Sequence, residues 1–183
     1  FIHKENRYND FENFPLNPWM ETDLGPLMAK GDVNGDGLED FYVGNSFNTP
    51  GCLYQQTADG HFKQISQSTW EPDKIYEAPG AVFFDFDLVR DQDLYVISGG
   101  AEAVAAQSKL AWQNRLYINT DGKGAYRRVS QASLPDISSV GLRVVANDYD
   151  HDGDPDLFIG GRVTPGKWPL TPPSYVLSND RNR

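Results

Sequence analysis

The chain has 183 residues, with 26 acidic and 16 basic side chains and a formal net charge of −10. This length suits one domain with a real hydrophobic core. The excess of acid excludes the basic face that nucleic-acid binding needs, and no apolar run approaches the roughly 20 residues of a membrane span. The chain shows no signal peptide and opens on Phe1 rather than Met, so we expect a processed or excised segment.

Residues 1–20 contain recurrent Asn and Pro, which predict an extended lead-in rather than a helix. The strand pattern begins after this lead-in. Apolar runs bounded by turn signals predict four short strands, at 25–30, 41–43, 52–56 and 61–65. The last two form a hairpin around the turn Ala58-Asp59-Gly60.

The same order of strands recurs twice. The second copy has strands at 80–84, 94–97, 115–119 and 126–129, and the third has strands at 141–145, 157–159 and 174–177. An alanine-rich insertion at 101–110 predicts a short helix on one face. The expected fourth strand of the third copy is missing.

Four short strands in each of several repeats indicate β-propeller blades. We therefore predict an all-β fold of about three four-stranded blades. The predicted divisions are a lead-in at 1–20, blade 1 at 21–73, blade 2 at 74–135 and an incomplete blade 3 at 136–183.

An acidic loop separates the first two strands of each repeat, and the three loops hold 12 aspartates, out of 26 acidic residues in the chain. In the first and third loops, oxygen-bearing side chains at positions 1, 3 and 5 precede a glycine at position 6. Position 7 offers its carbonyl and position 9 a carboxylate. Such hard oxygen donors favour Ca²⁺ over zinc, copper or magnesium. The alternative is an Asp/Asn/Gly-rich turn that holds no ion.

The candidate ligands of the first loop are Asp32, Asn34, Asp36, the Leu38 carbonyl and Asp40. Those of the third loop are Asp148, Asp150, Asp152, the Asp154 carbonyl and Asp156.

The second loop departs from this pattern at two positions. Val89 replaces the acid at position 5, and Arg90 replaces the glycine at position 6. Its candidate ligands are Asp85, Asp87, Asp91 and Asp93. We expect this site to be weak or empty, with the Arg90 guanidinium neutralising the carboxylates in place of a metal.

Outside the loops, few residues suggest chemistry. Cys52 is the single cysteine, and we expect it to be a buried small hydrophobe. His151 occupies a variable position of the third loop, where a solvent-facing role is expected. The four tryptophans are expected to pack between blades, with sugar stacking as the alternative. Motifs for a nucleophile or a phosphate loop are absent from the sequence, so we do not expect an enzyme.

The flanked loops GPLMAKGDVNGDGLEDFYVGN and ANDYDHDGDPDLFIGG resemble FG-GAP/VCBS repeats, which occur in integrin α-subunit propellers and in bacterial secreted or surface proteins. The hairpins CLYQQTADGHF and RLYINTDGKGAY look like the outer strands of that family. The lead-in FIHKENRYNDF resembles segments of the bacterial ASPIC/UnbV-associated, cartilage-acidic-protein-like group. The resemblance implies a calcium-stapled propeller, usually of seven blades, in an extracellular or cell-surface setting.

Three blades cannot close a ring. The remaining blades are therefore expected from a parent chain or from other copies, and Phe1-Ile2-His3 is a candidate for the missing strand. The predicted function is a calcium-binding propeller segment that serves as a binding or adhesion module for a protein or glycan ligand. The alternatives are a propeller enzyme acting on polysaccharide, as a lyase or hydrolase, and a purely architectural repeat.

Overall fold

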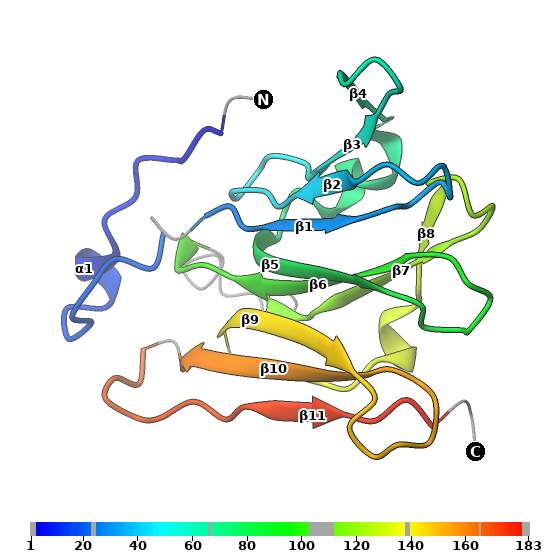
Figure 1. The fold of residues 1–183 in the computed structure, drawn as a ribbon. Coiled ribbons are helices and arrows are strands. Elements are labelled where there is room, and N and C mark those ends of the chain that lie inside the picture. Colours follow the sequence, from blue (N-terminus) through cyan, green and yellow to red (C-terminus); the bar gives the residue numbers. More distant parts are fainter. Residues whose placement is uncertain are drawn as a thin grey trace.

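The computed structural model describes residues 3–22, 25–65, 67–102, 112–137, 140–164 and 166–180. Their strands form three antiparallel sheets that follow one another along the chain (Figure 1). Within each sheet every strand pairs with the next strand in sequence, as in the blades of a propeller. The predicted all-β fold is confirmed.

The first sheet contains β1 (Met28–Gly31), β2 (Asp40–Val43), β3 (Cys52–Gln56) and β4 (Phe62–Gln64). The second contains β5 (Glu77–Phe84), β6 (Asp93–Gly99), β7 (Arg115–Asn119) and β8 (Tyr126–Arg128). The third contains β9 (Val140–Asn147), β10 (Asp156–Val163) and β11 (Tyr175–Leu177), and β11 is its outer edge among the described residues. The residue limits of the three predicted blades stay a prediction.

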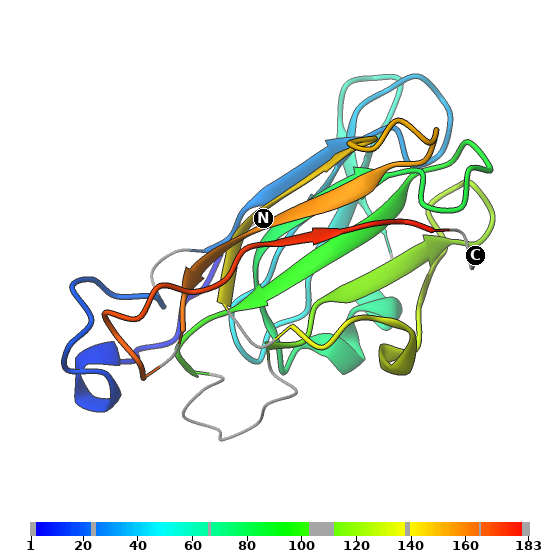
Figure 2. The same ribbon diagram turned by 90° about the horizontal axis from the view of Figure 1, so that it is seen from below.

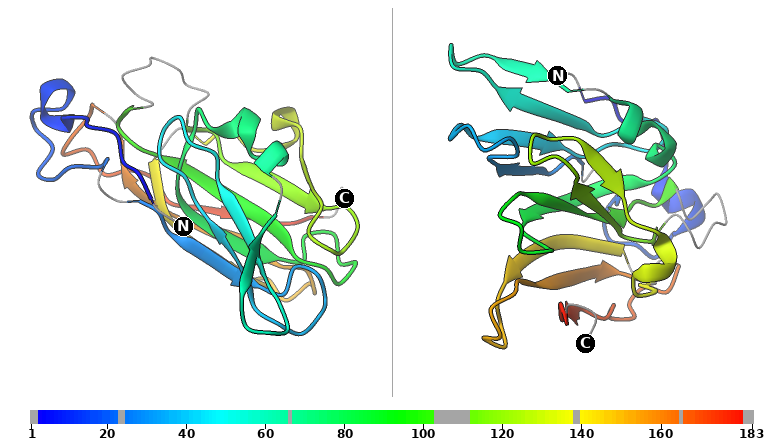
Figure 3. Two further views of the ribbon diagram at one scale, coloured as in Figure 1. Left: turned by 90° about the horizontal axis from the view of Figure 1, so that it is seen from above. Right: turned by 90° about the vertical axis from the view of Figure 1, so that its right-hand side faces the viewer.

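The three sheets stack face to face as layers, with the second sheet between the other two (Figure 3). Because side chains alternate between the faces of a strand, the second sheet supplies both cores from neighbouring residues. Phe83, Leu94 and Tyr117 pack toward the first sheet. Phe84, Tyr95 and Leu116 pack toward the third sheet. This double burial explains why every residue of β6 is buried.

Trp70 fills the space between the first two sheets. It follows β4, and its side chain is 2% exposed. Its ring lies 5.1 Å from the Tyr42 ring, 4.7 Å from the Tyr117 ring and 5.6 Å from the Tyr126 ring. The expectation that tryptophan packs between blades is confirmed for this residue, whose burial removes a large apolar surface from water.

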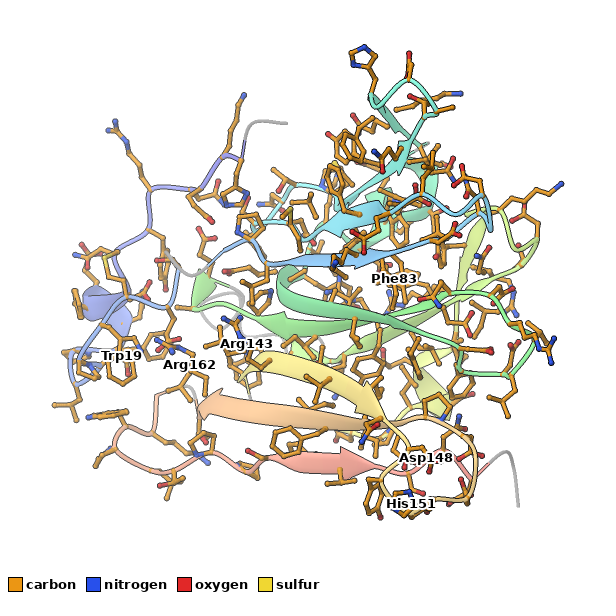
Figure 4. All side chains as sticks on the ribbon, in the orientation of Figure 1. Trp19, Phe83, Arg143, Asp148, His151 and Arg162 are labelled. Carbon is orange, nitrogen blue, oxygen red and sulfur yellow. The ribbon has the colours of Figure 1, made fainter. Side chains whose placement is uncertain are left out.

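The other tryptophans lie elsewhere. Trp19 and Trp168 pack edge to face with ring centroids 5.3 Å apart, and the Arg162 guanidinium lies 5.0 Å from the Trp19 ring (Figure 4). Trp112 is half-buried after the second sheet's insertion. Cys52 is buried in β3, as expected for a small hydrophobe.

Apolar side chains also cover the outward faces of the first and third sheets. On the first sheet, the Phe41 ring lies 4.9 Å from the Tyr54 ring and 4.8 Å from the Phe62 ring. On the third, Val145, Phe158 and Val176 form a row across the strands and are each about half exposed. Both outward faces therefore carry apolar side chains, like the faces that are buried between the sheets.

The lead-in differs from its predicted extended form. It contains the one-turn helix α1 (Asp10–Asn13), which lies at the end of the sheets away from the acidic loops (Figure 1). The Asn9 side chain caps this turn by accepting from the Phe11 N–H. Asp10 is fully buried, and its carboxylate accepts hydrogen bonds from the Thr22 N–H at 3.1 Å and the Thr22 hydroxyl at 2.8 Å. These capping contacts explain why the segment turns.

Two further expectations concern the ends and the insertion. His3 lies beside Gly25, on the side of the first sheet and not at β11, whereas Phe1 and Ile2 lie outside the described residues. The predicted helix at 101–110 lies almost wholly outside them as well. Within the described ranges, none of the helices has the length and apolar character needed to cross a bilayer.

Candidate metal centres

The three acidic loops lie at the same end of the stacked sheets, between the first and second strands of each (Figures 1 and 2). Each loop begins at or just after the end of its first strand, with Asp32, Asp85 and Asp148 at position 1. Positions are counted from these aspartates below.

The three loops share one backbone path. Position 4 has a positive φ in each, at Gly35 (73°), Leu88 (61°) and His151 (63°). Position 6 does the same, at Gly37 (83°), Arg90 (69°) and Gly153 (96°). Arg90 therefore adopts the left-handed conformation that glycine takes in the other loops, although a Cβ makes it unfavourable. Loss of the glycine has not changed how the second loop wraps.

A backbone-to-carboxylate hydrogen bond closes each loop. The N–H of position 6 donates to the carboxylate of position 1, at 2.8 Å for Gly37 to Asp32. The matching distances are 3.0 Å for Arg90 to Asp85 and 3.2 Å for Gly153 to Asp148. This bond draws the first carboxylate over the loop, where the other acids also point.

The carboxylate at position 9 ties each loop to the rest of its sheet. One oxygen accepts from the N–H of position 2, and the other accepts from an N–H at the end of the third strand or just beyond it. In the second sheet, Asp93 accepts from Phe86 at 2.9 Å and from Asn119 at 2.9 Å. Asp40 and Asp156 make the matching pairs at 2.8 to 3.0 Å. The sequence pattern indicated a ligand here and missed this second role.

The second loop gathers the most carboxylates. One oxygen from each of Asp85, Asp87, Asp91 and Asp93 lies within 4.8 Å of the others. Asp85 Oδ1 and Asp91 Oδ1 are buried and have no hydrogen-bond partner in the described part of the chain. Burial raises the pKa of Asp93 to about 6, and burial together with Asp87 and Asp85 raises the pKa of Asp91.

Arg90 does not neutralise this cluster. Its residue is exposed, and its side chain makes no ion pair within the described ranges. The prediction that the Arg90 guanidinium neutralises these carboxylates in place of a metal is therefore wrong. The left-handed backbone at Arg90 directs its N–H, and not its side chain, to Asp85. Four carboxylates thus converge without an ion pair to any lysine or arginine in the ranges that the structure describes.

The third loop brings together one oxygen from each of Asp148, Asp150 and Asp156 within 4.8 Å. Asp148 Oδ1 is buried without a hydrogen-bond partner among the described residues. His151 is exposed at the tip of the loop, as expected (Figure 4). Asp152 and Asp154 contribute no carboxylate oxygen to the 4.8 Å set.

The first loop holds its side chains by hydrogen bonds within the loop. Asp32 accepts from the Gly35 N–H at 2.8 Å, and the Asn34 amide donates to Asp36 at 2.9 Å. The Leu38 N–H donates to Asp36 at 2.8 Å. In the described chain, its three aspartates are not drawn within 4.8 Å of one another as those of the other two loops are.

The donor set at each loop consists of carboxylate, amide and carbonyl oxygens. Close carboxylates repel each other and raise their own pKa values unless a cation compensates them. The unpartnered, buried oxygens of Asp85, Asp91 and Asp148 fit a hard cation with oxygen coordination. The acidic clusters of the second and third loops can therefore hold a metal ion.

Comparison with known proteins agrees with this repeated geometry. A model of the FG-GAP-like repeat family matches residues 32–98, from the first acidic loop through most of β6. Cartilage acidic protein 1 of Xenopus tropicalis is 27% identical over 138 residues, which make up 73% of this chain. The chain spans 19% of the length of that relative. Residues 32–98 are thus similar to the FG-GAP-like repeat family, and the three equivalent sheets with their acidic loops agree with this similarity.

Proposed function

We propose that the chain is a calcium-binding segment of a β-propeller. Bound Ca²⁺ would stabilise each acidic loop by coordinating its oxygen ligands. The observation that carries this proposal is the convergence of four carboxylates within 4.8 Å in the second loop, two of them with buried, unpartnered oxygens. A divalent cation would remove the repulsion between them, and no basic side chain among the described residues pairs with these carboxylates.

The ligands we assign follow the loop positions. They are Asp32, Asn34, Asp36, the Leu38 carbonyl and Asp40 in the first loop; Asp85, Asp87, Asp91 and Asp93 in the second; and Asp148, Asp150, Asp152, the Asp154 carbonyl and Asp156 in the third. Position 9 retains lone pairs for a cation while it accepts its two backbone hydrogen bonds. The second loop is included because its carboxylates converge, although its sequence predicts a weak or empty site.

Calcium titration by calorimetry tests the metal assignment. Wild-type protein should bind Ca²⁺ at more than one site and bind Mg²⁺ much more weakly, since Mg²⁺ demands a rigid octahedron. Asp87→Asn and Asp150→Asn should each remove or weaken one site. Asp59→Asn is the matched control, since Asp59 lies in the exposed turn of the first sheet's hairpin and bonds to Thr57 and His61 of that turn. Wild-type stoichiometry in Asp87→Asn would show that the second loop does not bind the ion.

We further infer that the protein acts as an extracellular or cell-surface binding or adhesion module, within a propeller of about seven blades that further blades complete. The support is the FG-GAP-like repeat, a family that points to a non-enzymatic extracellular module. A protein or glycan ligand is proposed. The exposed Trp19, flanked by Trp168 and Arg162, favours the glycan because aromatic rings stack on sugars.

A binding screen separates the remaining candidates. Trp19→Ala should weaken retention on a glycan array at least tenfold, whereas Trp112→Ala serves as a tryptophan control outside the Trp19–Trp168 ring pair. Release of new reducing ends from a polysaccharide would favour the lyase or hydrolase alternative. Retention that is unchanged in Trp19→Ala would contradict the glycan assignment.

A further inference from the structure

The first acidic loop contains an asparagine followed by a glycine, Asn34-Gly35, which is the sole Asn-Gly pair in the sequence. The equivalent pairs of the other two loops are Asp87-Leu88 and Asp150-His151. The backbone nitrogen that follows an asparagine can attack its side-chain carbonyl, and glycine hinders this attack least because it has no side chain. The first loop thus combines an amide side chain with an unshielded backbone nitrogen, which the other two loops do not.

The backbone at Gly35 is open to its surroundings. Gly35 is exposed and has a φ of 73°. In the described chain, no heavy atom apart from its two neighbours lies within 4 Å of the place that a Cβ would take. Its N–H donates to the Asp32 carboxylate at 2.8 Å. The position of this nitrogen is therefore set by the loop itself, without a packed element that would obstruct attack.

Asp36 holds both ends of the Asn34 side-chain amide. The Asp36 N–H donates to Asn34 Oδ1 at 3.1 Å, and Asn34 Nδ2 donates to Asp36 Oδ2 at 2.9 Å. A donor at Oδ1 stabilises the negative charge that develops on this oxygen when a nucleophile adds to Cγ. The attacking nitrogen belongs to the next residue, so the reaction needs no second molecule to bind. The loop thus activates the amide and places the nucleophile beside it.

We propose that Asn34 is a site of spontaneous deamidation, at which the Gly35 nitrogen closes a succinimide ring. The bond from this nitrogen to Asn34 Cγ forms, and the bond from Cγ to Nδ2 breaks. The proton of the Gly35 N–H passes through water to the departing nitrogen, which leaves as ammonia. Water then opens the ring at either carbonyl and gives aspartate or isoaspartate at position 34. The net reaction consumes one water molecule and releases one ammonia molecule.

The two products change the first loop in opposite ways. Aspartate supplies at position 3 the carboxylate that Asp87 and Asp150 supply in the other loops, so it should strengthen Ca²⁺ binding. Isoaspartate adds a methylene to the backbone between positions 3 and 4. This insertion shifts Gly37 away from the 2.8 Å hydrogen bond to Asp32 that closes the loop, so it should weaken Ca²⁺ binding.

Occupancy of the loop by Ca²⁺ should slow the reaction. Ring closure requires Asn34 Cγ to turn toward the Gly35 nitrogen, whereas coordination of Asn34 Oδ1 together with Asp32 and Asp36 would hold the side chain in place. The effects on and of Ca²⁺ rest on the proposed function, whereas the ring closure in the metal-free loop does not.

Peptide mapping by mass spectrometry, after incubation of the whole chain in EGTA at physiological pH and temperature, measures amide loss at each asparagine. Labelling by an isoaspartate methyltransferase identifies the rearranged product. Asn34 should lose its amide at least about tenfold faster than Asn13, which is exposed and precedes Phe14. Both aspartate and isoaspartate should appear at position 34, since the ring opens at either carbonyl.

Two variants test the role of the glycine. Gly35→Leu copies Leu88, which has a φ of 61° at the equivalent position, and should slow amide loss at Asn34 at least about tenfold. The double variant Asp150→Asn/His151→Gly transfers the pair to the third loop. There the Asp152 N–H already donates to Asp150 Oδ1 at 3.2 Å, as Asp36 does to Asn34. This variant should lose the new amide as fast as Asn34 does.

Three outcomes would overturn the proposal. They are amide loss at Asn34 no faster than at Asn13 in EGTA, unchanged loss in a folded Gly35→Leu, and a stable amide in the transferred pair. Addition of Ca²⁺ should slow the loss at Asn34 at least about tenfold. Calorimetry on Asp36→Asn separates the two failures of this arm. A Ca²⁺ site that Asp36→Asn removes but that does not slow the loss contradicts the protection. Absence of Ca²⁺ binding contradicts the proposed function, and the comparison in EGTA still decides the modification.

Discussion

The side-chain amide of Asn119, at the end of β7, donates a 2.9 Å hydrogen bond to the backbone carbonyl of Val33 in the first acidic loop. The same contact recurs one sheet later, where the Asn179 amide donates to the Phe86 carbonyl at 2.8 Å. In both cases the acceptor is position 2 of the preceding loop, whose N–H is held by its own position 9 aspartate. Each loop is thus fixed by two neighbouring sheets at one residue.

Replacement of Asn119 by Ala should lower the free energy of unfolding by about 1–3 kcal/mol, because it leaves the Val33 carbonyl and the Gly124 N–H without their partner. Urea unfolding measures the change. Asn13→Ala is the control, since its amide bonds only to the exposed Tyr8 hydroxyl, and it should change stability by less than about 0.5 kcal/mol. Equal effects of the two variants would show that the contact between sheets contributes nothing.

Asp93→Asn and Asp87→Asn should separate the structural and metal-binding roles of the second loop. An amide at position 93 can accept only one of the two backbone hydrogen bonds, so this variant should lose about 1–3 kcal/mol even in EGTA. Asp87 is exposed, and its variant should be at least as stable as wild type in EGTA, because it removes one of the four mutually repelling carboxylates. Ions that bind only the native state stabilise it, so Ca²⁺ should raise the Tm of wild type. The rise in Tm on addition of Ca²⁺ should be smaller for Asp87→Asn than for wild type. A wild-type Tm that EGTA leaves unchanged would contradict the metal reading.

Arg90→Gly should stabilise the protein by about 0.5–1 kcal/mol, since glycine adopts a positive φ without the steric cost that a Cβ adds. Thermal unfolding in EGTA isolates this backbone effect from metal binding. Val89→Gly, at the neighbouring exposed position, should be neutral or destabilising. A loss of stability in Arg90→Gly would mean that the arginine side chain has a role of its own.

Glu77→Gln should stabilise the protein increasingly as the pH rises from about 4.5 to about 9. Glu77 is buried, with one carboxylate oxygen unpartnered in the described chain, and burial with Glu5 and Glu102 nearby raises its pKa to about 9. The native state therefore keeps the carboxyl protonated, and its stability falls as the pH rises through this window because the unfolded state releases the proton.

The gain from Glu77→Gln should be on the order of 4–5 kcal/mol near pH 8 and vanish below pH 4.5. Denaturant unfolding at a series of pH values, all in the same Ca²⁺ concentration, measures the difference between variant and wild type. Glu39→Gln is the control, because Glu39 lies exposed beside Lys30. A pH-independent difference would place the ionised form of Glu77 in the native state.

The strands were predictable because each repeat signals them locally. Apolar runs and turn residues placed nearly every strand, and Val89 and Arg90 set the second loop apart from the other two in sequence. The meaning of that departure was not predictable, since the arginine side chain points away while its backbone follows the path of glycine. Backbone conformation at a non-glycine position leaves no signal in the sequence.

Hydrogen-bond partners that lie far apart in the chain could not be predicted from the sequence either. Asn119 precedes Thr120, Asp121 and Gly122 and therefore looks like an ordinary turn residue, although its amide bonds to Val33. The position 9 aspartates looked like ligands alone, because one of the two N–H groups that each accepts from lies at or just beyond the end of the third strand, far along the chain. The ligand assignments themselves stay predictions.

The side-chain amides of Asn119 and Asn179 each bond to the acidic loop of the sheet that precedes their own in the sequence. Each loop is held from the sheet that follows it, so Val33 and Phe86 are secured, whereas the described residues supply no such contact to the Tyr149 carbonyl. Heat or denaturant should therefore open this chain from its third sheet, and the first loop should be the last to lose its shape.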